Sequence, residues 1–310
     1  MKLLVLLLLV APVWSQTLTP PTPARPPVRS IISIYDTKSR SVRVLYEADQ
    51  HYEAPNWSPD GRYLLINGGG KLYRLPLAGG SPQPVDLGDL AAVNNDHGIS
   101  PDGRHYAISA RGPQGGSEVY VTNAQGGERR RLSTKAPSYF HGWSPDGQWL
   151  AFTSKREADY NLYRVAITGG PEEQLTADPG YDDGPDYSPD GKWIYFNSER
   201  AEGWDLYRIP ATGAGPGDKL TERLTRDAYE DWFPHLSPNG KQIVFISFEK
   251  GTKGHPSNQN VVLRMMPANG KGQPRIIHRL FGGQGTMNAN FRESGAQEFT
   301  FMVPWPPKSR

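Results

Sequence analysis

The sequence predicts an all-β fold, a six-bladed β-propeller whose blades are four-stranded antiparallel sheets. Three observations support this prediction. A turn with the pattern Ser-Pro-Asp/Asn-Gly recurs along the chain, an apolar strand follows most copies, and no segment has a sustained helical period. Four short strands in a repeat of about 45 residues are typical of a propeller blade, which buries its faces only by stacking into a ring.

The recurring turn is the most regular feature of the chain. An aromatic or aliphatic residue precedes its serine, which stands at positions 58, 100, 144, 188 and 237, so the spacing is 42 to 49 residues. Proline fixes φ at the first corner, and Asp-Gly or Asn-Gly completes the turn. A degenerate sixth copy occupies residues 291–295. We therefore predict six blades.

The remaining strands of each blade follow from the residues after the turn. The second strand comes directly after it, as in residues 149–152, and the third follows a polar loop, as in residues 161–165. A Gly-rich turn then leads to a short fourth strand, which often ends in Leu-Thr, as at Leu175-Thr176. The first strand of each blade is the segment just before the turn.

The last blade is predicted to be closed by the N-terminal hairpin. Residues 291–305 supply the sixth turn and its second strand, while residues 30–35 and 42–46 match third and fourth strands. Such pairing ties the two ends of the propeller together and removes an open sheet edge. The expected domain is a propeller over residues 30–305, followed by a tail over 306–310.

The N-terminal segment indicates export. Residues 1–15 have a positive Lys2, a short apolar stretch and a small-residue end, which is typical of a cleaved signal peptide; a buried N-terminal strand is the alternative. A membrane span needs about 20 apolar residues, and no segment of the chain reaches that length. Residues 16–29 form a Pro-rich linker. We expect a periplasmic or secreted protein without a transmembrane segment.

Composition excludes several classes of function. The 34 basic and 32 acidic residues nearly balance, and no stretch resembles a nucleic-acid-binding arm, so we expect no nucleic-acid partner. The chain has no cysteine, which rules out disulfides, cysteine catalysis and a lipid-modified N-terminal cysteine. It also lacks the Gly-x-Ser-x-Gly motif of serine hydrolases. We expect a monomer.

With these turns and flanking strands, residues 30–305 resemble the TolB-type propeller repeat, a WD40-like repeat. The resemblance implies a six-bladed ring that acts by binding. TolB carries an α/β domain ahead of its propeller, whereas this chain has the Pro-rich linker at that place. The segments 231–237, 254–256 and 281–286 resemble a subgroup of stand-alone exported TolB-like proteins.

The candidate site is the polar lining of the central channel. In propellers the first strand of each blade lines this channel, and here those strands carry polar side chains that a packed core would not tolerate unpartnered. A channel filled with water or ligand removes that cost. The candidate ligand-binding residues are His97, His141, Asp182, Asp183, Asp186, Glu230, Asp231, His235, Gln284, Asn288 and Asn290.

Three functions remain open for this ring. It could be a solvated channel, a binding module for a protein segment or an oligosaccharide, or a metal-assisted carbohydrate-active enzyme, a lyase or hydrolase. In the third case His97, His141 and His235 would hold a divalent Mn²⁺ or Ca²⁺ ion, although no cofactor is certain. Oligogalacturonate lyase is similar as a TolB-like propeller with a His-rich metal site, an analogy of fold alone.

Aromatic residues and one further histidine are weaker candidates. Aromatic residues beside the turns are expected to fill the space between blades. Trp204, Trp232 and Tyr139 lie nearer to loops and are better placed for contact with a sugar. His255 lies in the long loop 250–260, where we expect its side chain to be exposed.

Overall fold

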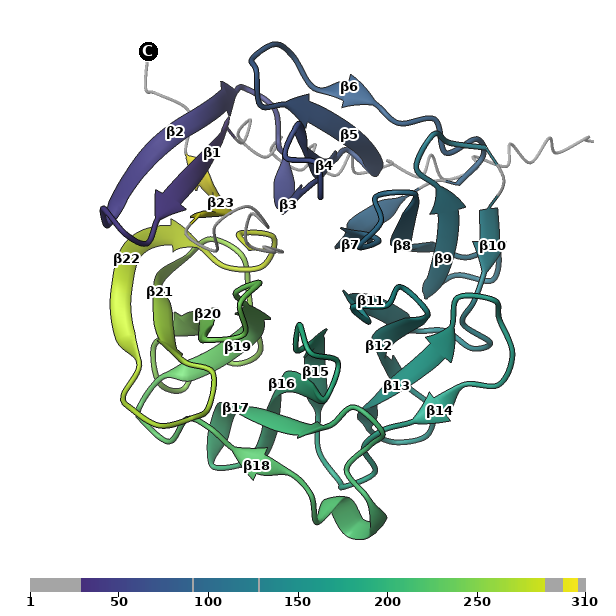
Figure 1. Cartoon of the computed structure of the whole chain (residues 1–310), viewed down its shortest axis with the longest axis vertical. Coiled ribbons are helices and arrows are strands. Elements are labelled where there is room, and N and C mark those ends of the chain that lie inside the picture. The colour runs from purple at the N-terminus through teal and green to yellow at the C-terminus, as the bar shows by residue number, and fades with distance from the viewer. Residues whose placement is uncertain (1–28, 91, 128, 288–297, 306–310) are drawn as a thin grey trace, which may run out of the picture.

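The described part of the chain is a ring of six antiparallel sheets arranged as propeller blades (Figure 1). The computed structural model describes residues 29–90, 92–127, 129–287 and 298–305. The predicted signal peptide at 1–15, nearly all of the linker, the sixth turn and the tail lie outside these residues. Within the described residues, no helix is long and apolar enough to cross a membrane.

Five blades have four strands each, which follow one another in chain order from the centre of the ring outward (Figure 1). The innermost strands are β3 (Glu53–Trp57), β7 (Val93–Ile99), β11 (Ser138–Trp143), β15 (Asp182–Tyr187) and β19 (Glu230–Leu236). The second strands are β4 (Tyr63–Gly68), β8 (His105–Arg111), β12 (Trp149–Lys155), β16 (Trp193–Ala201) and β20 (Gln242–Phe248). The third strands are β5 (Lys71–Pro76), β9 (Ser117–Asn123), β13 (Tyr160–Ala166), β17 (Gly203–Pro210) and β21 (Gln259–Pro267). The outermost strands are β6 (Gln83–Pro84), β10 (Arg129–Arg131), β14 (Glu173–Gln174), β18 (Glu222–Arg223) and β22 (Arg275–Gly282).

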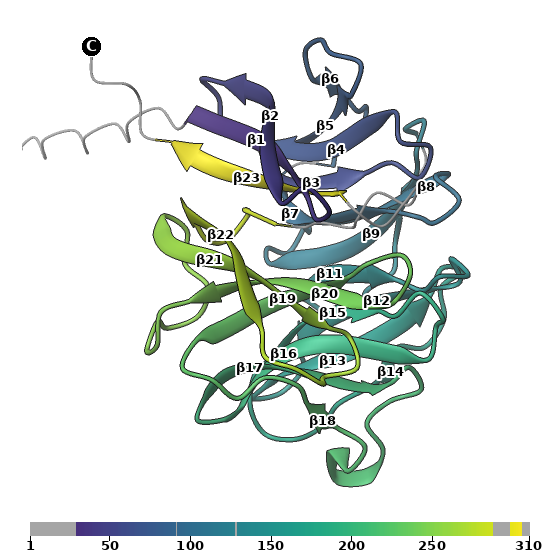
Figure 2. The same ribbon diagram turned by 60° about the vertical axis from the view of Figure 1, so that its left-hand side comes forward.

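The sixth blade joins the two ends of the propeller. Its described strands are β2 (Ser41–Ala48), β1 (Arg29–Asp36) and β23 (Glu298–Trp305), in that order (Figure 2). β1 pairs with β23 along its whole length, with Ile32 opposite Met302. The predicted closure of the last blade by the N-terminal hairpin is therefore confirmed.

The five described Ser-Pro-Asp/Asn-Gly turns share one hydrogen-bond pattern. In the first turn the Ser58 hydroxyl donates to Asp60 at 2.7 Å and accepts from the backbone N–H of Tyr63 at 3.0 Å. The N–H of Gly61 donates to the Ser58 carbonyl at 2.8 Å, and its φ of 67° lies in the left-handed region that favours glycine. The same turn is thus built in each blade, and it holds the end of the innermost strand in a fixed place.

Apolar side chains of neighbouring blades meet to form the core. Between the third and fourth blades, Ala151 and Leu162 pack with Phe196 and Tyr207 in one buried cluster. The turn-side tryptophan Trp149 packs against this cluster and lies under the guanidinium of Arg164, whose Cζ is 4.4 Å from the ring centroid. The expectation that aromatic residues beside the turns fill the space between blades holds here.

Candidate functional site

The innermost strands are irregular at the level of the channel. Each of them has a register shift against its second strand, and in β11 the shift falls between Phe140 and Gly142, which places His141 in the bulge. In β19 the shift spans Phe233, a bulky residue with a φ of 54°, in the left-handed region. Bulges re-aim side chains, and positive φ at a large residue marks a position that its surroundings hold under strain.

One cavity lies at the end of the channel where the innermost strands run into the turns, and we call it the turn-side cavity. Its volume is about 460 Å³. Prolines from all five described turns form its rim: Pro59, Pro101, Pro145, Pro189 and Pro238. The side chains inside this rim include Asn56, Phe140, His141, Trp143, Asp186, Tyr187 and His235.

Asp186 and His235 form the polar centre of the turn-side cavity. His235 Nδ1 lies 3.6 Å from Asp186 Oδ2, and the backbone N–H of Leu236 donates to the same oxygen at 3.2 Å. Asp186 is the only Asp, Glu, Lys or Arg among the described residues that line this cavity. The cavity thus presents one carboxylate inside a rim of five prolines.

A second cavity lies at the opposite ends of the innermost strands, and we call it the tyrosine cavity. Its volume is about 250 Å³. It is lined by Asn94, Asn95, Asp96, Tyr139, His141, Tyr160, Tyr181, Asp183, Phe233, His255 and Gln284. A third space of about 10 Å³ shares Asp186 and His235 with the turn-side cavity and Asp96 and Phe233 with the tyrosine cavity. That volume holds about one water molecule.

Asp183 connects two imidazoles at the floor of the tyrosine cavity. His141 Nε2 lies 3.1 Å from one of its carboxylate oxygens, and His255 Nε2 lies 3.7 Å from the other. Burial opposes the charged imidazolium, but the hydrogen bond and charge of Asp183 raise the pKa of His141 above its ordinary value. Burial lowers the pKa of His255, so this second imidazole favours the neutral form.

Asp96 is the other carboxylate of the tyrosine cavity. It accepts hydrogen bonds from the side-chain amides of Asn94 at 3.0 Å and Asn95 at 3.1 Å. Among the residues that the structure describes, no lysine or arginine forms an ion pair with it. Burial raises the pKa of Asp96 to about 6, even though His141 pulls in the other direction. Asp96 is therefore a carboxylate whose charge is only partly compensated.

Aromatic rings form the walls of the tyrosine cavity. Tyr160 and Tyr181 stack with their centroids 4.4 Å apart. Phe233 stacks on His141 at 5.8 Å and meets His255 edge-on at 5.0 Å. Burial raises the pKa of Tyr139 to about 12, so its hydroxyl stays protonated and can donate a hydrogen bond.

The structure brings together only part of the predicted channel ring. His141 borders both cavities, Asp186 and His235 line one, and Asp183 and Gln284 line the other. His97 lines neither of them. It is fully buried, and burial lowers its pKa to about 4, so its imidazole is neutral at physiological pH.

The difference between His97 and His141 arises from the bulges. Both residues stand three positions before a turn serine, but His97 pairs regularly with Ile108 whereas His141 is the bulged residue of its strand. In β7 the bulge falls on residues 94–96 instead, which places Asp96 in the channel. A shift of the bulge therefore exchanges which side chain faces the channel.

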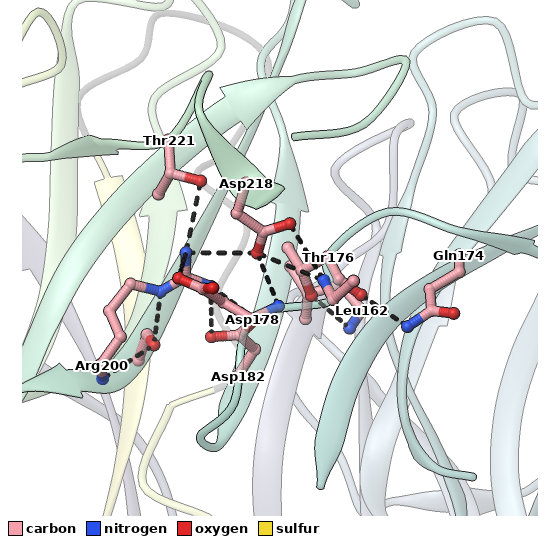
Figure 3. A network of polar contacts seen from close by, with 10 residues as sticks. Leu162, Gln174, Thr176, Asp178, Asp182, Arg200, Asp218 and Thr221 are labelled. Atoms are coloured by element: carbon pink, nitrogen blue, oxygen red, sulfur yellow. Dashed lines mark hydrogen bonds and ion pairs between the residues drawn. The ribbon is translucent and has the colours of Figure 1, made fainter. Parts of the chain in front are cut away.

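Three predicted carboxylates belong to the packing of the blades and not to the channel cavities. Asp182 accepts two hydrogen bonds from Arg200, at 2.7 and 2.8 Å, and Figure 3 shows the Arg200 guanidinium between Asp182 and Asp218. Glu230 accepts hydrogen bonds from the backbone N–H groups of Trp204 and Gly251.

Asp231 is the third of these carboxylates. It accepts a hydrogen bond from Ser247 at 2.6 Å and lies 3.3 Å from Arg264. Burial raises its pKa to about 7. The interpretation of Asp182, Glu230 and Asp231 as residues of the channel mouth is therefore corrected, because each carboxylate binds groups of neighbouring strands or loops and none of the three lines either channel cavity. Asn288 and Asn290 lie outside the described residues.

The aromatic and histidine expectations were wrong in part. His255 is not exposed: 19% of its side chain is accessible, and its ring lies 4.4 Å from that of Trp232. Trp204 and Trp232 are buried and stack at 3.8 Å, which leaves Tyr139 as the sugar candidate that lines a cavity. Tyr160 and Tyr181 gave no signal in the sequence, because they lie at the edges of blades and outside the repeated turn.

The three imidazoles predicted as metal ligands do not form a metal site. Among the described residues, no group of three or more His, Asp and Glu side chains has an arrangement that could hold a metal ion. His97 lies within the packed blade, and His235 and His141 face different carboxylates. The geometry thus gives no support to the predicted Mn²⁺ or Ca²⁺ site.

Comparison with known proteins agrees with this architecture. Residues 134–268 match the family model described as the TolB beta propeller domain. An uncharacterised protein of Agrobacterium fabrum is 44% identical over 280 residues, which cover 90% of this chain and 94% of that protein. A solved structure from Agrobacterium tumefaciens, provisionally assigned as TolB, superposes with a TM-score of 0.85 at 44% identity, covering 90% of this chain and 99% of that one. The Tol-Pal system protein TolB of Francisella tularensis is 32% identical over 34% of this chain and 23% of its own length.

Proposed function

The chain belongs to the TolB β-propeller family, and on that premise we propose that it is an exported binding module that holds a segment of a partner protein in the turn-side cavity. Export rests on the signal-peptide pattern of residues 1–15. The family relation supports a binding role, since relatives are named as proteins of the Tol-Pal system. The site of binding is argued from the geometry of this chain.

The proline rim of the turn-side cavity is the observation that carries the proposal. Five prolines from five separate blades surround the cavity, and each is fixed by an identical turn. Such a rim loses little conformational entropy when a ligand enters, which favours binding. The rings of Trp143 and Tyr187 add flat apolar surface. An extended segment of polypeptide would fit this rim better than a fully hydroxylated sugar chain.

Asp186 defines the charge that the ligand should carry. It lies at the centre of the cavity beside His235, and 24% of its side chain is accessible. With no lysine or arginine among the described lining residues, a basic side chain or a free amino group of the partner would complement it. We therefore propose a partner segment that presents a cationic group to Asp186.

Selection of random heptapeptides displayed on phage against the purified protein tests this function. We expect enrichment of peptides with lysine or arginine, and their affinity should fall about tenfold in Asp186→Asn. Asp190→Asn is the matched control, because Asp190 is an exposed carboxylate in the turn of the same blade. Equal binding by both variants, or enrichment of peptides without basic residues, would contradict the proposal.

A glycan array probed with the same protein separates the two ligand classes. The proposal expects no glycan whose binding depends on Asp186. Glycan binding that is lost in Asp186→Asn, together with failure of the peptide selection, would replace the protein ligand with an oligosaccharide. The metal-assisted lyase or hydrolase is not advanced, because the described histidines and carboxylates do not converge on a metal site.

A further inference from the structure

We propose that the tyrosine cavity is a second and separate binding site, which takes a small organic cation of the quaternary ammonium class. This site differs from the proposed protein-binding site in position and, apart from the shared His141, in lining. It lies at the opposite ends of the innermost strands, and the space that adjoins both cavities has room for only about one water molecule. Its volume of about 250 Å³ suits a small molecule better than a polypeptide.

Aromatic rings are the first element of the proposed site. Tyr139, Tyr160, Tyr181 and Phe233 all line the cavity, and they come from three different blades. The faces of such rings carry negative electrostatic potential, and cages of several rings are the usual way in which proteins hold quaternary ammonium groups.

The charge of the cavity is the second element. Its described lining contains two carboxylates, Asp96 and Asp183, and no lysine or arginine. Asp183 faces His141 at 3.1 Å, whereas Asp96 has no hydrogen bond or ion pair with a cationic side chain among the described residues and accepts from the amides of Asn94 and Asn95. An anionic ligand would be repelled here, whereas a cation would compensate a partly buried charge that is otherwise costly.

The surrounding structure fixes the position of these groups. Phe233 is held at a φ of 54°, and its ring is packed between His141 and His255. Tyr181 packs edge-on against the buried Trp204 at 5.1 Å, and its stacking on Tyr160 holds the second ring in place. The rings are therefore positioned before a ligand arrives, which reduces the entropy lost on binding.

Choline and its neutral isostere 3,3-dimethylbutan-1-ol provide a matched pair of probes. The two molecules have the same shape and differ in the charge of one central atom. Isothermal titration calorimetry at pH 8, where Asp96 is ionised, should show binding of choline and at least about tenfold weaker binding of the neutral alcohol. Equal binding of the two would show that the cavity recognises shape and apolar surface alone, and would overturn the proposal.

Variants locate the binding to this cavity. Asp96→Asn and Tyr139→Leu should each weaken choline binding on the order of tenfold, while Tyr139→Phe, which retains the ring, should bind as the parent does. Asp186→Asn, a carboxylate change at the other cavity, is the matched control and should leave choline binding unchanged. Choline affinity that is the same in Asp96→Asn and in the parent would overturn the assignment, as would binding of methyl glucoside in place of choline.

Discussion

Asp182 and Asp183 are neighbours on β15, yet their carboxylates lie in different surroundings. Asp182 turns into the blades, where Arg200 donates two hydrogen bonds to it at 2.7 and 2.8 Å (Figure 3). Asp183 turns to the channel, where it meets His141 at 3.1 Å and His255 at 3.7 Å beside an open cavity. One position along a strand thus separates a carboxylate that pairs with an arginine from a carboxylate that faces a cavity.

The two regions differ in how completely their polar atoms are used. Asp218 accepts a hydrogen bond from Arg200 at 3.3 Å and further hydrogen bonds from the backbone N–H groups of residues 177 and 178. The rings of Phe196 and Tyr207 lie within about 5.4 Å of the same guanidinium. The polar cluster of the tyrosine cavity is arranged differently. It has two imidazoles, His141 and His255, around the carboxylate of Asp183, and a further carboxylate, Asp96, lines the same cavity. We expect the saturated network to stabilise the fold, and the unsaturated cluster is where we propose that a ligand binds.

The largest effect is expected from breaking the saturated network. Arg200→Met keeps the apolar stem but leaves Asp182 and Asp218 buried without their counter-charge, so the free energy of unfolding should fall by about 3–5 kcal/mol. Urea unfolding at pH 7 measures this loss. Arg62→Met is the control, because 82% of the Arg62 side chain is exposed and its ion pair with Asp60 should contribute about 0–1 kcal/mol.

Equal losses in Arg200→Met and Arg62→Met would remove the distinction between the two regions. Choline binding is a second measurement that compares the Arg200 network with the tyrosine cavity. It should be unchanged in Arg200→Met wherever the variant is folded, since Arg200 contacts Asp182 and Asp218 and not the lining of the tyrosine cavity.

A smaller effect is expected from Asp183→Asn. At a pH below 6.5 His141 is an imidazolium, and the substitution removes its ionised partner. A hydrogen bond between charged groups contributes about 1.5–3 kcal/mol to stability. The folded-state pKa of His141 is raised, so this contribution is fully present below the unfolded pKa and is lost as the pH rises through the folded pKa. Burial raises the pKa of Asp183, but His141, His255 and the backbone N–H of Gly184 together lower it below its ordinary value, so the contribution also disappears in acid.

Urea unfolding of Asp183→Asn at pH 5.5 and pH 8.5 tests the sign of this dependence. The variant should lose more stability at pH 5.5 than at pH 8.5, and an NMR titration should show a lower pKa for His141. A loss that does not change with pH, with an unmoved His141 titration, would mean that the two side chains are not an ion pair.

The sequence predicted the propeller architecture better than it predicted the candidate site. The repeated turn fixes six blades, the direction of each strand and the closure of β1 on β23, because these depend on local turn chemistry and on pairing of the chain ends. The site depends on bulges, and their positions differ between β7 and β11 although both strands precede the same turn. Alternation along the sequence does not reveal a bulge, so the predicted ligand-binding residues include His97 and omit Asp96.

Long-range packing accounts for the other differences. His255 reaches Asp183 from a loop more than seventy residues away in the chain, and Tyr160 meets Tyr181 across two blades. The partners of Asp182 and Asp231, Arg200 and Arg264, likewise come from other strands. Charge and polarity mark such residues in a sequence, but the tertiary fold decides whether they face a cavity or a counter-ion.

The smallest effect is expected from Asp96→Asn, and it should be a gain in stability. The folded-state pKa of Asp96 is raised to about 6, chiefly by burial, so its neutral form contributes stability that is present below the unfolded pKa of 3.8 and is lost as the pH rises through about 6. Above that pH the ionised side chain costs stability, and an uncharged amide removes the cost. The gain is limited to about 1 kcal/mol, because asparagine accepts only one of the two amide hydrogen bonds that Asn94 and Asn95 donate.

Urea unfolding at pH 8 and pH 4 separates this effect from a general change in packing. Asp96→Asn should be more stable than the parent at pH 8 and no more stable at pH 4, where Asp96 is already neutral. Addition of choline at pH 8 should stabilise the parent and not the variant. The difference in free energy of unfolding between them should therefore shrink or change sign. A variant that is less stable than the parent at pH 8 would show that Asp96, like Asp182, stabilises the fold. A gain in stability that choline reverses would instead show that the charge of Asp96 serves ligand binding at the expense of stability.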